Sequence, residues 1–339
     1  VTSFGAIVTD YMTPYVHMGI GIRGQPEPQH YFHRPIFMLL NTCFKHGFVL
    51  DRLEELAEMR ETFEIFQAVD GFSAAWLDPD EVYGLEPRLA PGIIRALRTE
   101  GNKALNSHAY TVALSKAAER HGATLRIGVV TGLRTHAGRA TGVVLEDGEV
   151  ACDHVVLATG PWVGEVERWL DVSIPVEPLK GEILRMELTE ELPPDHDFAC
   201  GSVDLFHRAD GLTWIGTTEE RKGFDLRPSE SVRRTLLEGA TRVMPALADA
   251  RLVKHTACLR PVTADWLPII GRAPDWDNVY IATGGAKKGI LLSPAMGKAI
   301  ADLITDGSTQ LPIDAFHVHH TCIFPFSLCL FFFSLINPH

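Results

Sequence analysis

Apolar residues recur at helical spacing in several stretches of the chain and form short strand-like runs in others. Apolar side chains at Leu53, Leu56, Met59 and Phe63 share one face of a helix, because residues three or four apart lie on the same side. The pattern predicts helices at residues 51–69, 108–123, 229–247 and 293–307. Apolar runs bounded by turns predict strands at residues 47–50, 124–135, 140–150, 150–160, 174–188, 211–220 and 278–284.

Composition places the chain among globular proteins. It has 339 residues, of which 46% are hydrophobic and 22% are charged, and this length is enough for two domains. The formal net charge of −12, without any basic run, gives no electrostatic reason for binding to nucleic acid. Six cysteines without a C-x-x-C pair, and a start without a basic segment or a clean apolar run, favour reduced thiols and a cytoplasmic location.

The end of the chain differs from the rest. Residues 322–337 are almost wholly apolar, yet they are fewer than the ~20 residues that span a bilayer, and they include Pro325. We expect residues 309–339 to be a tail appended to the fold, and contact of this tail with a membrane is the other interpretation. The histidines of H-V-H-H at residues 317–320 form a weak metal-binding pattern, and no metal site is predicted.

The segment G-I-G-I-R-G, Gly19 to Gly24, has the spacing of a dinucleotide-binding loop. Such a loop needs a strand before its first glycine and a helix that begins at its last, where free N–H groups meet the pyrophosphate. Pro14 interrupts the expected strand, and Pro28 interrupts the first turns of the expected helix. The segment is therefore predicted to be a flexible glycine loop, and binding of a nicotinamide cofactor there is the weaker alternative.

The segment from His255 to Ile304 carries a more specific pattern. Its motifs are L-R-P at 259–261, P-x-I-G at 268–271, a strand that ends in A-T-G at 282–284, and G-I-x-L-x-P-x-x-G at 289–297. These motifs resemble the C-terminal flavin-binding segment of the D-amino-acid oxidase and glycine oxidase superfamily of FAD-dependent oxidoreductases. With V-V-L-A-T-G-P-W and P-L-K-G-E upstream, the resemblance covers about residues 47–308.

The resemblance implies FAD as the cofactor. Glycines at strand ends let the backbone approach a flat ring closely, and a helix N-terminus suits the anionic edge of a reduced flavin. Lys287 and Lys288 add positive charge beside that helix. The cofactor-binding residues that the resemblance implies are Val130, Ala158, Thr159, Gly160, Trp162, Gly284, Gly285, Lys287, Lys288, Gly289 and Ile290.

The arginine of L-R-P holds the substrate carboxylate in this family, and the resemblance assigns that role to Arg260. A guanidinium pairs with a carboxylate through two parallel hydrogen bonds, which an ammonium cannot reproduce. The implied reaction is oxidation of the C–N bond of a small amino acid to an imine, with hydride transfer to the flavin. Glycine, a D-amino acid and an N-methyl amino acid are the implied substrates.

The chain departs from the glycine-oxidase pattern near the substrate. Asp204 stands where family members often carry a tyrosine, and Glu219 stands where glycine oxidases have a methionine. Asp204 is expected either to hold the substrate ammonium or to face water. Cys258 stands where the sarcosine-oxidase branch links a cysteine covalently to the flavin, although that branch lacks L-R-P. The alternative for Cys258 is a cysteine buried in a strand.

The larger departure is at the N-terminus. Family members begin with a strand, a G-x-G-x-x-G loop and a helix that bind the ADP half of FAD, and residues 1–46 do not supply this unit convincingly. We therefore expect an N-terminally incomplete member of the family that binds FAD weakly or not at all.

The resemblance also predicts how the chain is divided. We expect an α+β fold in which an incomplete α/β-type FAD-binding domain is interleaved with a substrate domain built on a large mixed or antiparallel sheet. The FAD-binding domain takes residues 101–170 and 261–308, and the substrate domain takes residues 47–100 and 171–260. An irregular segment at 1–46 and the tail at 309–339 complete the chain.

Two functions remain open from the sequence. The first is an FAD-dependent amino-acid oxidoreductase, which the flavin-facing motifs and Arg260 favour. The alternative is a truncated, non-catalytic remnant of the family that binds no FAD, which the missing fingerprint favours. A flavin absorption spectrum of the purified protein distinguishes the two.

Overall fold

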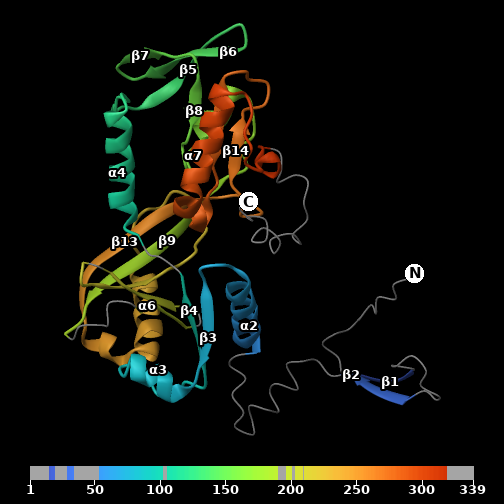
Figure 1. Cartoon of the computed structure of the whole chain (residues 1–339), viewed down its shortest axis with the longest axis vertical. Helices are drawn as coiled ribbons and strands as arrows, with labels where there is room; N and C mark the ends of the chain where they lie inside the picture. The colour runs from blue at the N-terminus through green and yellow to red at the C-terminus, as the bar shows by residue number, and fades with distance from the viewer. Residues whose placement is uncertain are drawn as a thin grey trace. The chain divides into compact units, whose positions relative to one another are not determined.

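The structure is a computed structural model that describes residues 53–101, 105–189, 196–200, 203–208 and 210–318, and the backbone of strands β1 (Tyr15–Gly19) and β2 (Gln29–His33). Contacts divide the chain into two compact units. Figure 1 shows the elements of both units, coloured along the chain. The first unit comprises residues 1–77 and 95–102, and the second comprises residues 78–94 and 103–339.

The first unit contains one long helix and two short antiparallel sheets. Helix α2 (Leu53–Ala68) confirms the helix predicted at 51–69. Strands β3 (Ser73–Leu77) and β4 (Ala96–Glu100) pair with each other, and the aromatic ring of Phe63 on α2 lies 5.9 Å from that of Trp76 on β3. The strand predicted at 47–50 lies outside the described residues.

The glycine-rich N-terminal motif follows β1. Gly19 is the last residue of β1, and residues 20–24 lie outside the described part of the chain. β1 pairs with β2 in antiparallel register, so the described element that follows the motif is a strand. The assignment of the motif as a flexible loop stays a prediction.

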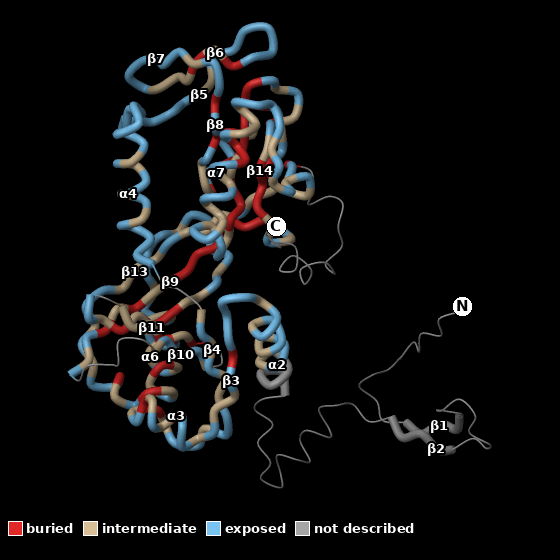
Figure 2. Tube along the Cα trace, in the orientation of Figure 1, coloured by how far each residue is buried: buried red, intermediate tan, exposed pale blue. Residues whose placement is uncertain are grey.

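The second unit is built on a five-stranded antiparallel sheet in the order β10–β11–β12–β9–β13. Its strands are β9 (Glu177–Glu187), β10 (Phe198–Cys200), β11 (Val203–His207), β12 (Thr213–Gly216) and β13 (Arg251–Val262). One face of this sheet is apolar, because Leu184, Leu205 and Ile215 are almost completely buried there. In Figure 2 the buried residues run along β9. This face is a hydrophobic core of the second unit.

Helix α6 (Glu230–Val243) packs on the apolar face of the sheet. Ser229 begins the helix by accepting a hydrogen bond from the N–H of Val232 at 3.2 Å, which satisfies a donor that the first turn leaves unpaired. A Cβ at Gly239 would lie closer than 3.0 Å to the side chain of Val203 on β11, so the glycine lets the helix approach the strand. The helix predicted at 229–247 is confirmed, and its last residues form the 3-10 helix η1 (Pro245–Asp249).

A three-stranded sheet in the order β14–β15–β8 forms the other core of this unit. Its strands are β8 (Val155–Leu157), β14 (Ile269–Arg272) and β15 (Val279–Thr283). β15 pairs with β14 in antiparallel register and with β8 in parallel register, which brings two distant parts of the sequence side by side (Figure 1). Helix α7 (Gly289–Thr305) lies along this sheet and buries Ala299 and Ile300 against Tyr280.

The other described elements of the second unit are shorter or more exposed. They are α3 (Pro79–Leu85), α4 (Ser107–Arg120), α5 (Val163–Leu170), η2 (Ala286–Lys288), η3 (Asp314–Phe316) and the antiparallel sheet β5 (Val130–His136), β6 (Arg139–Leu145) and β7 (Gly148–Ala151). Helix α4 has no buried residue and is largely exposed in Figure 2, although Tyr110 forms a hydrogen bond with Ser293 of α7 at 3.1 Å. The helix predicted at 108–123 is confirmed.

Helix α7 begins earlier than the sequence predicts. The sequence pattern predicts that this helix begins at residue 293, next to Pro294, which has no N–H for a helix interior. The observed helix starts at Gly289 and contains Pro294. The hydroxyl of Ser293 donates to the carbonyl of Ile290 at 2.8 Å, and this carbonyl is the one that Pro294 leaves without its usual donor. A local side-chain hydrogen bond thus compensates for the proline.

The predicted start of the C-terminal tail at residue 309 is wrong. Val318 is 3% exposed and belongs to the core around β8 and β15, and Phe316 packs against the cluster beneath α7. Thr309 donates a hydrogen bond to Asp302 of α7 at 2.9 Å. Residues 309–318 are therefore part of the fold, and residues 319–339 lie outside the described chain. No helix within the described ranges is long and apolar enough to cross a bilayer.

The predicted α+β class is confirmed, since an antiparallel sheet and a mixed sheet each pack against helices. The five-stranded sheet falls almost entirely within the predicted substrate segment 171–260, and the three-stranded sheet falls within the predicted FAD-binding segments. Residues 78–94 of the predicted segment 47–100 belong to the second unit, where the N–H of Ala90 donates to the carbonyl of Val243 at 2.8 Å. The domain boundaries themselves stay a prediction.

Candidate active site

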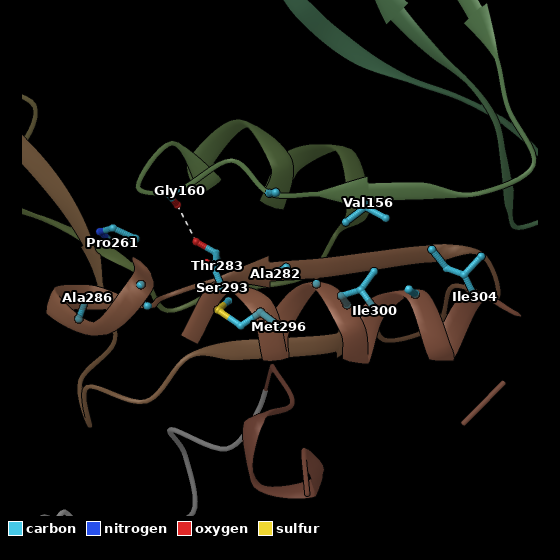
Figure 3. Close-up of a pocket in the computed structure, with 15 residues that line it drawn as sticks. Val156, Gly160, Pro261, Ala282, Thr283, Ala286, Ser293, Met296, Ile300 and Ile304 are labelled. Atoms are coloured by element: carbon cyan, nitrogen blue, oxygen red, sulfur yellow. Dashed lines mark hydrogen bonds between the residues drawn. The ribbon is translucent and has the colours of Figure 1, made fainter. Parts of the chain in front are cut away.

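Strands β8 and β15 run parallel, and the glycines that follow them lie close together. The hydroxyl of Thr283, the last residue of β15, donates to the carbonyl of Gly160 at 2.8 Å, as the dashed line in Figure 3 marks. Gly160 has a φ of 57° and Gly284 a φ of 75°, a left-handed conformation that glycine adopts without strain. Two of the predicted strand-end glycines are thus brought to one place in the fold.

A cavity of about 600 Å³ lies beside these strand ends and α7. In Figure 3, Val156 and Ala282 reach it from the two strands, and Ser293, Met296 and Ile300 reach it from the helix. Small residues make up much of its wall: Ala158, Gly160, Ala282, Gly285, Gly289 and Gly297. Walls without long side chains leave the backbone accessible to a flat ligand.

Helix α7 turns a face of small residues toward the cavity. Gly289, Ser293, Gly297 and Ala301 all line it, and residues four apart lie on the same side of a helix. A Cβ at Gly289 would meet no atom within 4 Å, so the space beside the first turn is open. A Cβ at Gly285 would lie 2.7 Å from the Cα of Gly289, so residue 285 has to be a glycine.

Polar groups without partners accompany this cavity. The hydroxyl of Thr159 is buried and has no hydrogen-bond partner among the described residues, although both of its neighbours in sequence line the cavity. Helix α7 has no side-chain cap, since Lys288 at its N-cap makes no such hydrogen bond. No side chain of the described residues thus occupies the N-terminus of the helix, where the helix dipole favours an anionic acceptor. An apolar wall with a few unpaired donors suits a flat heterocycle that carries carbonyl groups.

The register of the five-stranded sheet places Arg260 and Asp204 on one face. Neighbouring residues of a strand point to opposite faces, and Leu205 points toward α6. Asp204 therefore projects from the other face, together with Gly216 opposite it. The pairing continues through β9 to β13, where Arg260 projects from the same face as Asp204.

Arg260 is half-buried and has no carboxylate partner among the described residues. Its Nη1 donates to the carbonyl of Thr218 at 3.2 Å. The next residue, Pro261, lines the cavity, so β13 leads directly from the arginine to the cavity wall. A half-buried guanidinium with unused N–H groups is a site for an anion, and a carboxylate fits its planar fork.

Charges from three segments meet near Asp204. Burial raises the pKa of Asp204, the positive charge of Lys287 lowers it, and Asp197 raises it again, with a net upward shift. Lys287 also forms an ion pair with Glu219 and lies 5.7 Å from the ring centre of Trp266. The predicted flavin-side lysine and the predicted substrate-side aspartate are thus close enough to interact.

A buried charged cluster supports the opposite face of the same strands. Lys180 Nζ lies 2.8 Å from Glu182 Oε1, and His255 Nε2 lies 2.7 Å from Glu182 Oε2. The Glu182 side chain is 0% exposed and also accepts the N–H of Ser229 at 2.9 Å. Burial by itself raises the pKa of Glu182, but Lys180, the Ser229 N–H and His255 together hold this pKa below its usual value. These contacts fix β9 and β13 beside the start of α6.

Some predicted residues lie away from the cavity wall. Val130 begins β5, and Trp162 is 56% exposed with its ring beside Phe224, and neither lines the cavity. Ile290 is 39% exposed on the first turn of α7 and does not line it either. Cys258 lies in β13 as expected but is exposed, so the interpretation as a buried cysteine is wrong. It stands on the face of the sheet that carries Arg260, two residues away.

Sequence reasoning missed several residues of this region. Thr283 ties the two strand ends together, and Thr218 holds Arg260. The small residues Ser293 and Ala301 of α7 continue the cavity wall, and their spacing of four from Gly289 and Gly297 was the signal that could have found them. In the described part of the chain, no group of three or more His, Cys, Asp or Glu side chains is arranged to hold a metal ion.

Comparisons with known proteins agree with this geometry. The family model described as FAD dependent oxidoreductase (DAO) matches residues 36–303. Glycine oxidase of Pseudomonas aeruginosa is 32% identical over 229 residues, which cover 67% of this chain and 62% of that protein. D-amino acid dehydrogenase of Xanthobacter autotrophicus is 34% identical over 239 residues, which cover 67% of this chain and 56% of that protein.

A solved structure shares the fold. The crystal structure of glycine oxidase from Geobacillus kaustophilus superposes with a TM-score of 0.71 at 28% sequence identity, covering 78% of this chain and 72% of that chain. The chain spans 48% of the length of a glycine oxidase from Pseudomonas putida and 62% of the one from Pseudomonas aeruginosa. Its match to these relatives thus concerns a part of their length.

Proposed function

Because this chain belongs to the DAO family of FAD-dependent oxidoreductases, we propose that it oxidises the C–N bond of a small amino acid with FAD as cofactor. The observation that carries the proposal is the position of Arg260, a half-buried arginine without a carboxylate partner in the described chain, next to a cavity walled by small residues. Glycine, D-amino acids and N-methyl amino acids are the proposed substrates, in line with the glycine oxidases and the D-amino acid dehydrogenase that resemble the chain.

The residues around the cavity fit a flavin. Ala158, Gly160, Gly285 and Gly289 carry small side chains or none, the Thr159 hydroxyl offers a donor, and the N-terminus of α7, which has no side-chain cap, faces the same region. Bound there, FAD would supply the acceptor for a hydride from the substrate α-carbon, a redox step that no amino-acid side chain performs. The protein binds and orients the substrate.

Arg260 binds the substrate carboxylate through the N–H groups that Thr218 leaves unused. Asp204, on the same face of the sheet, supplies a negative charge for the substrate amino group, which loses its ammonium proton before the hydride leaves the α-carbon. A cation beside Asp204 lowers the pKa of this carboxyl, as Lys287 already does, and so favours its ionised form. The two side chains orient the substrate by its two charged ends.

The proposal predicts that filling the cavity at Gly289 weakens FAD binding. In Gly289→Leu the new side chain enters open space, since a Cβ at this position meets no atom within 4 Å, and the helical φ of −54° suits any residue. We expect FAD to bind the unchanged chain saturably, and to bind the variant at least about tenfold more weakly, a loss of one good contact. Quenching of flavin fluorescence on titration with protein measures the dissociation constant of FAD for the unchanged chain and for the variant.

Gly164→Leu is the matched control. Gly164 lies in the first turn of α5, meets no atom within 4 Å on addition of a Cβ, and does not line the cavity. Its substitution should leave FAD binding unchanged. If the unchanged chain shows no saturable FAD binding, the proposal is wrong and the chain is a non-catalytic remnant of the family.

A further inference from the structure

The guanidinium of Arg260 lies directly over Gly181 of the neighbouring strand. In the pairing of β9 with β13, Gly181 stands opposite Cys258, and Arg260 projects from the same face two residues further along. A Cβ at Gly181 would lie closer than 3.0 Å to Nη1, Nη2 and Cζ of Arg260. Any side chain at residue 181 would therefore displace the guanidinium.

The backbone conformation does not explain this glycine. Gly181 lies within β9 and is absent from the residues with positive φ, so every amino acid could adopt its conformation. Its flanking residues, Lys180 and Glu182, point to the opposite face, where they form the buried charged cluster. What requires a glycine at residue 181 is the space that the guanidinium occupies.

The segment around Thr218, which contacts the other side of the Arg260 guanidinium, is hydrogen-bonded to β9, the strand that contains Gly181. Thr218, whose carbonyl accepts from Arg260 Nη1, accepts the N–H of Glu182 on its own hydroxyl at 3.0 Å. Backbone hydrogen bonds in both directions join Lys180 and Glu220 at 2.9 Å. Residues 180–182 thus provide the surface beneath the guanidinium and also anchor the carbonyl beside it.

From this contact we infer that Gly181 is a positioning residue for substrate binding, an inference that rests on the proposed role of Arg260. By leaving room for the guanidinium against the strand, it sets the direction of the N–H groups that receive the substrate carboxylate. A displaced guanidinium still carries its charge, but it can no longer align two parallel hydrogen bonds with the substrate carboxylate. Gly181 acts through Arg260 and touches no reacting atom.

The inference predicts a selective loss in Gly181→Ala. With FAD in excess, we expect KM for a small amino acid to rise by about tenfold to a hundredfold, the effect of misplacing a binding group by roughly 1 Å, while kcat changes less. An amine that lacks the carboxylate should be oxidised at the same rate by the variant and the unchanged protein. Gly132→Ala is the matched control, because Gly132 is also a strand glycine and meets no atom within 4 Å.

A double-mutant cycle tests the contact without any assay of activity. Gly181→Ala should lower the unfolding midpoint of the unchanged chain measurably, and should have little effect in an Arg260→Ala background, where the colliding atoms are gone. An equal loss in both backgrounds would show that Gly181 acts on the fold independently of Arg260, and would overturn the inference.

The kinetic measurements distinguish a failure of the inference about Gly181 from a failure of the proposed function. If Arg260→Ala impairs the amino acid selectively while Gly181→Ala behaves like Gly132→Ala, the inference about Gly181 is wrong and the proposed function stands. If Arg260→Ala shows no preference for carboxylate substrates, the role of Arg260 fails and the inference fails with it.

Discussion

Arg260→Ala is expected to lower kcat/KM for a small amino acid by about 30-fold to several thousand-fold when FAD is in excess. Removing one partner of a buried, bidentate charge pair costs about 2–5 kcal/mol of binding free energy, and this range converts to that loss of rate. The loss should appear mainly in KM, because Arg260 holds the carboxylate and does not take part in breaking the C–H bond. Steady-state kinetics with glycine or a small D-amino acid measure the effect.

Arg260→Lys and a second substrate provide the controls. The lysine variant should recover a part of the activity, because an ammonium keeps the charge but not the planar fork. The matching amine without a carboxylate should be oxidised at similar rates by all three proteins. Equal losses on both substrates, together with a lower melting temperature, would instead assign Arg260 to the stability of the fold.

Lys180→Met is expected to destabilise the second unit by about 3–5 kcal/mol, the cost of leaving one partner of a buried ion pair uncompensated. The side chain of Lys180 is 2% exposed and that of Glu182 is 0% exposed, so water cannot replace the lost ammonium. Equilibrium unfolding in urea, followed by tryptophan fluorescence, measures the difference. Arg251→Met is the matched control, because the Arg251–Glu187 ion pair joins the same two strands but is exposed. This substitution should change the free energy of unfolding by less than about 1 kcal/mol.

The same cluster predicts a dependence on pH. The folded-state pKa of Glu182 lies below its usual value, so its stabilising effect is present above the pKa of the unfolded chain and is lost as the pH falls through the folded pKa. In Lys180→Met, Glu182 stays buried without the ammonium, and this raises the folded-state pKa of Glu182. The difference in the free energy of unfolding between the variant and the unchanged protein should therefore shrink as the pH falls. A deficit that stays constant from neutral to acidic pH would contradict this role for Glu182.

The sequence predicted elements whose causes are local. The apolar pattern located the helices α2, α4 and α6. Family motifs pointed to the ends of β8 and β15, and the hydrogen bond from Thr283 to Gly160 brings these ends together. The roles of the predicted site residues stay predictions.

Features that depend on distant parts of the chain escaped prediction. The fold extends to Val318 because this side chain fills a core formed by other segments. The contact between Gly181 and Arg260 depends on the register of two strands far apart in sequence. No hairpin turn joins β9 and β13, so no local turn sets their register.

The measurement that tests the central claim most directly is the anaerobic mixing of the protein and excess FAD with a small amino acid, followed by the visible absorbance of oxidised flavin. The account predicts that glycine, a small D-amino acid or an N-methyl amino acid bleaches this absorbance, and that the Arg260→Ala variant bleaches it far more slowly under the same conditions. Saturable binding of FAD without bleaching by any of these amino acids would contradict it.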